Sequence, residues 1–216
     1  MKFLSALVLF LSLAFVPNPA LAASPAHQLY DEAASLDRDG FFEEAAAAWE
    51  ALLKSDSEKK FRTIAMLKLA STYFKLAEFE KSIQTANKLT IEQPGNFHAF
   101  FHLANIASGT GNFSDAIKAF QKTIELKPEE GLGRVGLALS HFGNKEADQA
   151  LEILRDTKTL FKKQRNISWH RNVRIMINQI RGFDKYPPDF ANLWLENNFK
   201  LIRETYYKAL FDPEKL

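Results

Sequence analysis

The chain has no cysteine, only nine glycines, and no apolar run long enough to cross a membrane. The absence of cysteine excludes disulfide bonds, thiolate metal sites and a cysteine nucleophile. The longest apolar run, Phe3 to Val16, has 14 residues, whereas a membrane-spanning helix needs roughly 20. Stability must therefore come from packing of the hydrophobic residues, which make up 46% of the 216-residue chain.

Sequence patterns of catalysis are also missing. The chain has no serine in a glycine elbow, no phosphate-binding loop and no paired carboxylates in loops. The stretch from Gly131 to Gly136 has the glycine spacing of a dinucleotide fingerprint, but no strand precedes it. His98 and His102 have the spacing of two metal ligands on one helix, but no nearby acidic residue completes a site. We therefore expect no catalytic residue, no metal and no cofactor.

The first residues have the order of a secretory signal. Lys2 precedes the apolar run Phe3 to Val16, and small residues follow at Ala20 to Ala23. This arrangement predicts a signal peptide over residues 1–22, cleaved near Ala22. A membrane anchor is the alternative, although the run is short for it. The mature chain is expected in the periplasm or outside the cell.

The stretch from Phe97 to Glu130 contains two amphipathic helical patterns with a break between them. Their apolar residues recur at the spacing of one helix face: Phe100, Leu103, Ala104 and Ala107, then Ala116, Ile117, Phe120 and Ile124. Gly109 to Asn112 separates the two patterns. Asn96 is a suitable N-cap for the first helix, and Pro128 ends the second because proline has no amide hydrogen.

This unit resembles the tetratricopeptide repeat, a helix-turn-helix of about 34 residues that must stack on neighbours to bury its apolar face. Ala104 and Ala116 stand at the family's small positions and Pro128 at its closing proline. The same frame places repeats at 26–59, 63–96, 97–130 and 131–164 within a repeat array over 23–164. The resemblance implies an all-α fold, a right-handed superhelical solenoid of about four repeats, in a protein of the exported bacterial type.

The remaining segment, 165–216, is expected to close the array with two helices. An amphipathic stripe that includes Trp169, Val173 and Ile177 predicts a capping helix. A final helix from about Phe190 to Phe211 is rich in aromatic residues on more than one face. Such a helix should be covered on more than one side, either by the array or by a partner.

In stacked repeats of this family, fixed positions of each first helix face the concave groove. The resemblance implies a partner-binding groove of nine residues: Tyr30, Leu67, Ser71, Phe74, Lys75, His98, Phe101, Asn105 and Phe142. Phe101 and Asn105 stand where some members carry the lysine and asparagine of a carboxylate clamp, so we do not expect that clamp. The groove is instead largely apolar and suits an amphipathic helix or an extended apolar segment. The alternative is that several of these residues are core between repeats or are covered by the last helix.

Charge is unevenly distributed, although the net charge is only +2. Residues 23–154 hold 14 basic and 19 acidic residues, a balance of −5, and residues 155–216 hold 13 and 7, a balance of +6. A basic surface is expected over Lys162, Lys163, Arg165, Arg171 and Arg174. Its candidate partners are an anionic membrane surface, an acidic protein or the chain's own acidic repeats, and it is otherwise a solvated face. An exported protein is not expected to bind nucleic acid.

These observations predict a non-enzymatic interaction module, a scaffold or adaptor of the cell envelope, that holds a protein or peptide partner in its groove. A self-associating structural protein, in which the C-terminal helix of one copy fills the groove of another, is the first alternative. An envelope enzyme is the second, and no residue pattern favours it.

Overall fold

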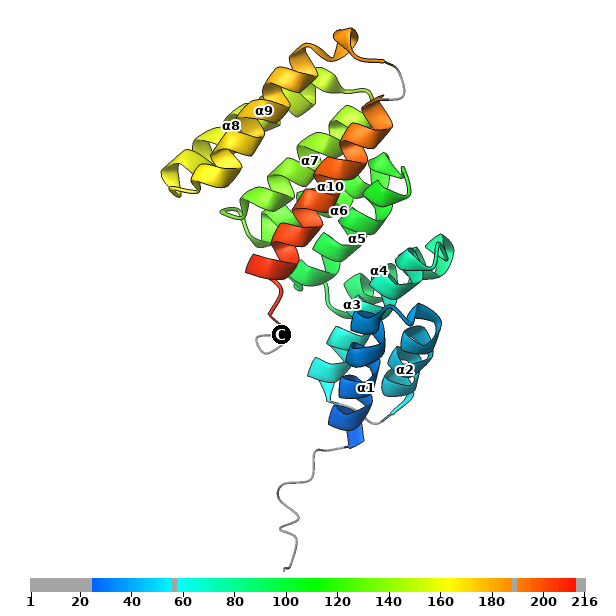
Figure 1. Ribbon diagram of the computed structural model, residues 1–216. Coiled ribbons are helices and arrows are strands. Elements are labelled where there is room, and N and C mark those ends of the chain that lie inside the picture. The colour runs from blue at the N-terminus through cyan, green and yellow to red at the C-terminus, as the bar shows by residue number, and fades with distance from the viewer. Residues whose placement is uncertain (1–24, 56–57, 188–189, 213–216) are drawn as a thin grey trace, which may run out of the picture.

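The computed structural model describes residues 25–55, 58–187 and 190–212, and these residues form ten α-helices, one 3-10 helix and no strand. Figure 1 shows them as a curved stack. The helices are α1 Pro25–Asp39, α2 Phe42–Lys54, α3 Lys59–Lys75, α4 Phe79–Glu92, α5 Phe97–Gly109, α6 Phe113–Leu126, α7 Gly131–Gly143, α8 Ala147–Lys163, α9 Ile167–Arg181, η2 Phe183–Lys185 and α10 Phe190–Ala209. The predicted signal peptide and its cleavage site near Ala22 lie outside the described residues.

Each helix from α1 to α9 packs on the next one in the chain, as expected for a solenoid. The predicted all-α solenoid is confirmed. Helix α3 begins at Lys59, four residues before the expected repeat start at Thr63. No glycine or proline interrupts residues 59–62, so they add about one turn to the helix.

Small buried residues allow the paired helices to approach closely. Ala104 and Ala116, the small positions of the third helix pair, are completely buried. In the second pair a serine replaces the second alanine, and the Ser82 hydroxyl donates a hydrogen bond of 2.6 Å to the Ala70 carbonyl. The substitution is therefore accommodated, because the buried hydroxyl has a partner.

A recurring turn ends five of the helices. In each, one residue has a left-handed backbone conformation, and the next residue's amide donates to a carbonyl five positions earlier. This is the Schellman arrangement, which satisfies carbonyls at a helix end. The left-handed residues are Gly40, Ala77, Gly111, Lys145 and Arg165.

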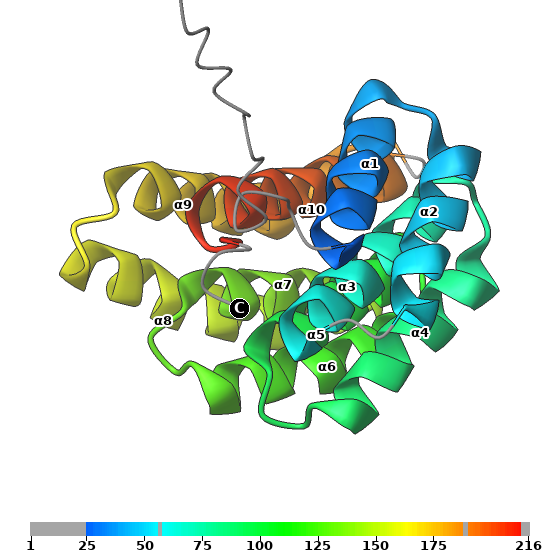
Figure 2. The ribbon, with the colours of Figure 1, turned by 90° about the horizontal axis from the view of Figure 1, so that it is seen from below.

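The odd-numbered helices α1 to α7 line the inner side of the stack and the even-numbered helices α2 to α8 the outer side (Figure 2). Helix α9 packs against α8 and closes the array through a buried stripe that includes Trp169 and Val173. Helix α10 then turns back into the concave side and contacts α7 and α5 (Figures 1 and 2). None of the described helices is both long and apolar enough to cross a membrane.

Candidate functional site

The concave face is divided into a covered part and an open part by helix α10. Of the nine predicted groove residues, His98, Phe101, Asn105 and Phe142 lie on α5 and α7, which α10 contacts. Tyr30, Leu67, Ser71, Phe74 and Lys75 lie on α1 and α3.

In the covered part, Tyr206 of α10 packs directly on two of the predicted groove residues. Its ring stacks on Phe101 with centroids 4.3 Å apart, and its hydroxyl lies 2.6 Å from Nδ1 of His98. Phe101 is only 1% exposed as a result. Asn105 is also buried, and its Nδ2 donates to the Phe101 carbonyl at 2.7 Å. A partner could not reach Phe101 unless α10 moved.

Phe142 of α7 is covered in the same way. Its ring lies 5.3 Å from that of Trp194 on α10 and 4.8 Å from that of Phe183 on η2. Trp194 is itself anchored, because its indole nitrogen donates to Gln179 Oε1 of α9 at 3.0 Å. The start of α10 is therefore held against both the groove and the capping helix.

On α1 and α3 the predicted groove residues have mixed surroundings. Leu67 is 1% exposed and belongs to a small core cluster with Met66, Leu89 and Ala99. Lys75 pairs with Asp37 of α1 at 2.6 Å and lies over the ring of Phe42. Tyr30 is partly buried against Trp49 and Phe61.

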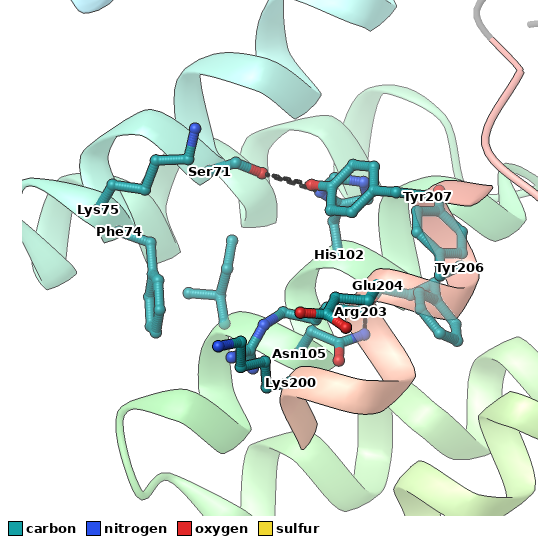
Figure 3. A pocket seen from close by; sticks show the side chains of 12 residues that line it. Ser71, Phe74, Lys75, His102, Asn105, Lys200, Arg203, Glu204, Tyr206 and Tyr207 are labelled. Carbon is teal, nitrogen blue, oxygen red and sulfur yellow. Dashed lines mark hydrogen bonds between the residues drawn. The ribbon is translucent and has the colours of Figure 1, made fainter. Parts of the chain in front are cut away.

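A cavity of about 320 Å³ opens where α3, α5 and the second half of α10 meet (Figure 3). Ser71 and Tyr207 close one side through a hydrogen bond of 3.0 Å between their hydroxyls. The lining is mostly apolar. It comprises Ser71, Phe74, Lys75, Phe101, His102, Asn105, Ile106, Lys200, Arg203, Glu204, Tyr206 and Tyr207.

The cavity brings together five predicted groove residues with seven that were not predicted. Ser71, Phe74, Lys75, Phe101 and Asn105 came from the repeat frame, whereas five of the others come from α10. The aromatic composition of α10 predicted that it would be covered on more than one side. This was wrong, because the array covers only the side of α10 that packs on α5 and α7, and Leu193 and Leu201 are exposed. No pattern in the sequence indicated which face of the array would cover it.

Two histidines of α5 are held neutral beneath α10. Burial lowers the pKa of His98 to about 4, and the charge of Lys127 adds to this effect. Burial also lowers the pKa of His102 to about 3, with contributions from Lys68 and His98. Within the part of the chain that the structure describes, no three histidine or acidic side chains gather as a metal site would require. The two rings contact aromatic residues of α10 instead.

The five residues of the predicted basic surface are all exposed, at the end of α8, in the following turn and on α9. Helix α9 contains no acidic residue. Ile167, at its first position, is 79% exposed. The surface combines positive charge with an exposed apolar side chain.

Comparison with known proteins agrees with this architecture. Two solved structures of MamA resemble the chain: one, titled as a crystal structure of the MamA protein, is 20% identical, covers 87% of this chain and 96% of its own, and has a TM-score of 0.58. The other, from Desulfovibrio magneticus RS-1, is 13% identical, covers 88% and 99%, and has a TM-score of 0.60. A structure of YrrB, described as a TPR protein with an unusual peptide-binding site, is 15% identical, covers 69% and 74%, and has a TM-score of 0.56.

At these identities the likeness establishes the fold alone. No curated protein matches the sequence significantly. The sequence profile of the tetratricopeptide repeat, however, matches residues 30–97 and 101–163, more than half of the chain. The chain therefore belongs to the tetratricopeptide repeat family.

Proposed function

We propose that this chain is a non-enzymatic interaction module of the cell envelope that binds an apolar or amphipathic segment of a partner protein in the open part of its concave groove. The observation that carries the proposal is the apolar cavity between α3, α5 and α10, next to the part of the groove that α10 already covers. Membership of the repeat family supports it, because stacked repeats of this kind present concave binding surfaces. The peptide-binding site named for YrrB supports it by analogy.

The cavity has the composition of a recognition site. Phe74 and Ile106 supply apolar surface, and polar groups stand at its edges. Pockets that bind ligands commonly combine apolar walls with a few polar groups that fix orientation. A partner that contributes one apolar side chain would fill this space without displacing α10.

The experiment is photo-crosslinking in producing cells, with a photoreactive residue at Phe74, which is partly exposed. We expect a crosslink to another protein. A matched control carries the same residue at Ile91 of α4, which is 80% exposed and does not line the cavity. Crosslinks from Phe74 only to α10, or the same products from both positions, would remove the groove from the proposal.

Export is part of the proposal and rests on the sequence. The order of basic residue, apolar run and small residues over residues 1–22 is that of a secretory signal. The absence of cysteine is compatible with an oxidising compartment, since no thiol would need protection there. N-terminal sequencing of the protein from a periplasmic fraction should begin near Ala23. An uncleaved chain in the cytoplasmic fraction would contradict this localisation.

Self-association is a second candidate, favoured by the way α10 fits the groove. Because α10 seals α5 and α7 through side-chain contacts, the same contacts could form between two copies that exchange this helix. Light scattering on the mature chain would then give the mass of a dimer. A monomer at all concentrations would rule out the exchange.

The basic surface has an anionic membrane as its proposed partner, because its exposed cations accompany the exposed Ile167. Vesicles that contain phosphatidylglycerol should sediment the protein, whereas phosphatidylcholine vesicles should not. The double variant R171E/R174E should lose sedimentation. Retained sedimentation would show that these arginines do not contact lipid.

A further inference from the structure

Arg203 of α10 is a cation without a counterion at the wall of the cavity. Its guanidinium carbon lies 5.9 Å from the centre of the Phe74 ring, so the side chain reaches across from α10 to α3. Among the described residues it forms no ion pair and no hydrogen bond. Burial lowers the pKa of Arg203, although Tyr207, Glu196 and Glu204 oppose this effect. The group has lost part of its hydration, and its contact with the Phe74 ring does not replace the hydrogen bonds to water.

The charges around Arg203 favour an anion. Lys200 lies one helical turn before Arg203, and the two cations lie on the same side of the cavity with Glu204 (Figure 3). Lys75 also lines the cavity, but its ammonium is engaged by Asp37 at 2.6 Å. Glu196 and Glu204 of the same helix partly offset these charges, but neither forms an ion pair with Arg203 or Lys200 among the described residues. A carboxylate from a ligand would complete the pairing.

The rest of the cavity suits a ligand that has both apolar and hydrogen-bonding groups. Phe74 and Ile106 supply apolar walls. Beside them, Oδ1 of Asn105 and Nε2 of His102 are buried without a hydrogen-bond partner among the residues described. An inorganic anion would leave the apolar walls unused. A peptide offers an apolar side chain, backbone amides and a carboxylate together.

We infer that the C-terminal helix is one wall of the binding site and that the site selects an acidic peptide segment of a partner protein. An apolar side chain of the segment occupies the cavity, and a neighbouring carboxylate pairs with Arg203 and Lys200. The inference rests on the proposed function and specifies its ligand. It differs from a carboxylate clamp built on repeat helices, because here the cations come from α10.

The size of the cavity agrees with this ligand. About 320 Å³ is near the lower limit of the pockets that bind small molecules, roughly 300–1000 Å³. A whole helix does not fit beside α10 in such a space. One apolar side chain with the adjoining backbone does.

The test is selection from a library of short random peptides displayed on phage, against the mature chain with α10 present. We expect enriched peptides to share an aromatic or aliphatic residue next to Asp, Glu or a free C-terminal carboxylate. Binding of a synthesised enriched peptide should weaken about tenfold or more in Arg203→Leu, since a charge-assisted hydrogen bond is lost. Exchanging the peptide's acidic residue for its amide should have a similar effect on the wild type and none on the variant.

Matched variants distinguish a loss of peptide recognition from a loss of α10 docking. Arg171→Leu on α9 removes an exposed arginine far from the cavity and should bind like the wild type. Arg203→Lys keeps the charge and should retain part of the affinity. Circular dichroism and melting of Arg203→Leu should match those of the wild type, which would show that α10 stays docked.

Two outcomes overturn the inference in distinguishable ways. Peptides that bind in the cavity, shown by loss of binding in Phe74→Ala, but have no preference for acidic residues and tolerate Arg203→Leu would refute the inference and leave the proposed function intact. A selection that enriches no peptide at all would refute both.

Discussion

The two halves of this solenoid bury their apolar surface in different ways. In the N-terminal half, one cluster joins α1, α2 and α3 around the fully buried Trp49. In the C-terminal half, a larger continuous cluster joins α5 to α9 with Trp194, Phe199 and Tyr206 of α10. The first half is an ordinary repeat stack, in which each helix contacts its neighbours. In the second half a helix distant in sequence crosses several repeats, so long-range packing replaces the open groove.

This comparison teaches that a repeat array can limit its own binding surface. Phe101 and Phe142 occupy groove positions of the repeat frame, yet α10 buries Phe101 completely and packs on the half-buried Phe142. Phe74 also occupies a groove position, is partly exposed, and lines the cavity with Arg203 of α10 over its ring. Groove positions therefore have a packing role where α10 crosses them and line a cavity beside it.

The largest expected effect comes from removing the main contact between α10 and the covered half. Tyr206→Ala deletes a ring that is 1% exposed and stacked on Phe101. Truncation of a buried aromatic residue costs about 3–5 kcal/mol of unfolding free energy. Urea denaturation measures the loss, and amide hydrogen exchange should increase in α5 and α7 but not in α1 and α2. Leu193→Ala, on an exposed part of α10, is the control; equal losses in both variants would show that α10 does not depend on this stack.

Acid should destabilise the covered half through two histidines whose pKa values are lowered beneath α10. The unfolded chain binds protons at His98 and His102 near pH 6.5, whereas the folded chain binds them only near pH 4 and 3. The unfolded state therefore holds more protons in this window, and the unfolding free energy falls as the pH is lowered. The slope is about 1.4 kcal/mol per pH unit for one fully buried histidine.

Urea denaturation between pH 7 and pH 5 tests this dependence. His102→Phe removes one of the two groups and should make the slope clearly smaller. An unchanged slope in this variant would mean that His102 is protonated in the folded chain as readily as in the unfolded one.

A methyl group added in the covered half should lower the free energy of unfolding more than one added in a connecting loop. A Cβ at Gly136 would lie 2.3 Å from the nearest ring atom of Phe120, which is completely buried. Overpacking of this kind costs about 1–3 kcal/mol. A Cβ at Gly95 meets nothing within 4 Å, so Gly95→Ala should change stability by less than about 0.5 kcal/mol. Thermal melts of the two variants give the difference, and similar melting temperatures would argue against tight packing of α6 on α7.

The smallest effect is expected in the open half. Lys75→Met removes the ion pair with Asp37, while Lys68 remains 3.8 Å from the same carboxylate. Partly exposed pairs contribute about 0.2–1 kcal/mol, and the difference should shrink in high salt. Lys118→Met, which breaks a more exposed pair with Asp115, should have no measurable effect. A larger loss at Lys75 would show that the open half depends on charge more than on its apolar contacts.

The repeats could be predicted because their signals are local. Helix periodicity, small residues such as Ala104 and Ala116, and the N-cap at Asn96 all act within a few turns, and Asn96 indeed accepts hydrogen bonds from the amides of His98 and Ala99. The position of α10 depends on contacts such as that between Ser71 and Tyr207, which are 136 residues apart. No periodic pattern encodes such a contact. The frame therefore supplied only part of the α3 and α5 walls of the cavity, without His102 and Ile106, and missed the α10 wall.

The recurring turn has its own limit of predictability. Gly40 and Gly111 are the expected residues for a left-handed position, but Ala77, Lys145 and Arg165 adopt the same conformation. The hydrogen bond to the carbonyl five residues earlier is kept in all five turns. The left-handed position of this turn therefore does not require glycine.

The placement of α10 also sets an order of events during biosynthesis. A ribosome completes α5 and α7 long before it completes α10, and the hydroxyl of Tyr206 that meets His98 is 108 residues further along the chain. Until the last helix emerges, the aromatic surface of α5 and α7 faces water. A nascent chain therefore exposes this apolar surface until α10 has been made, and the docking of α10 is the step that covers it.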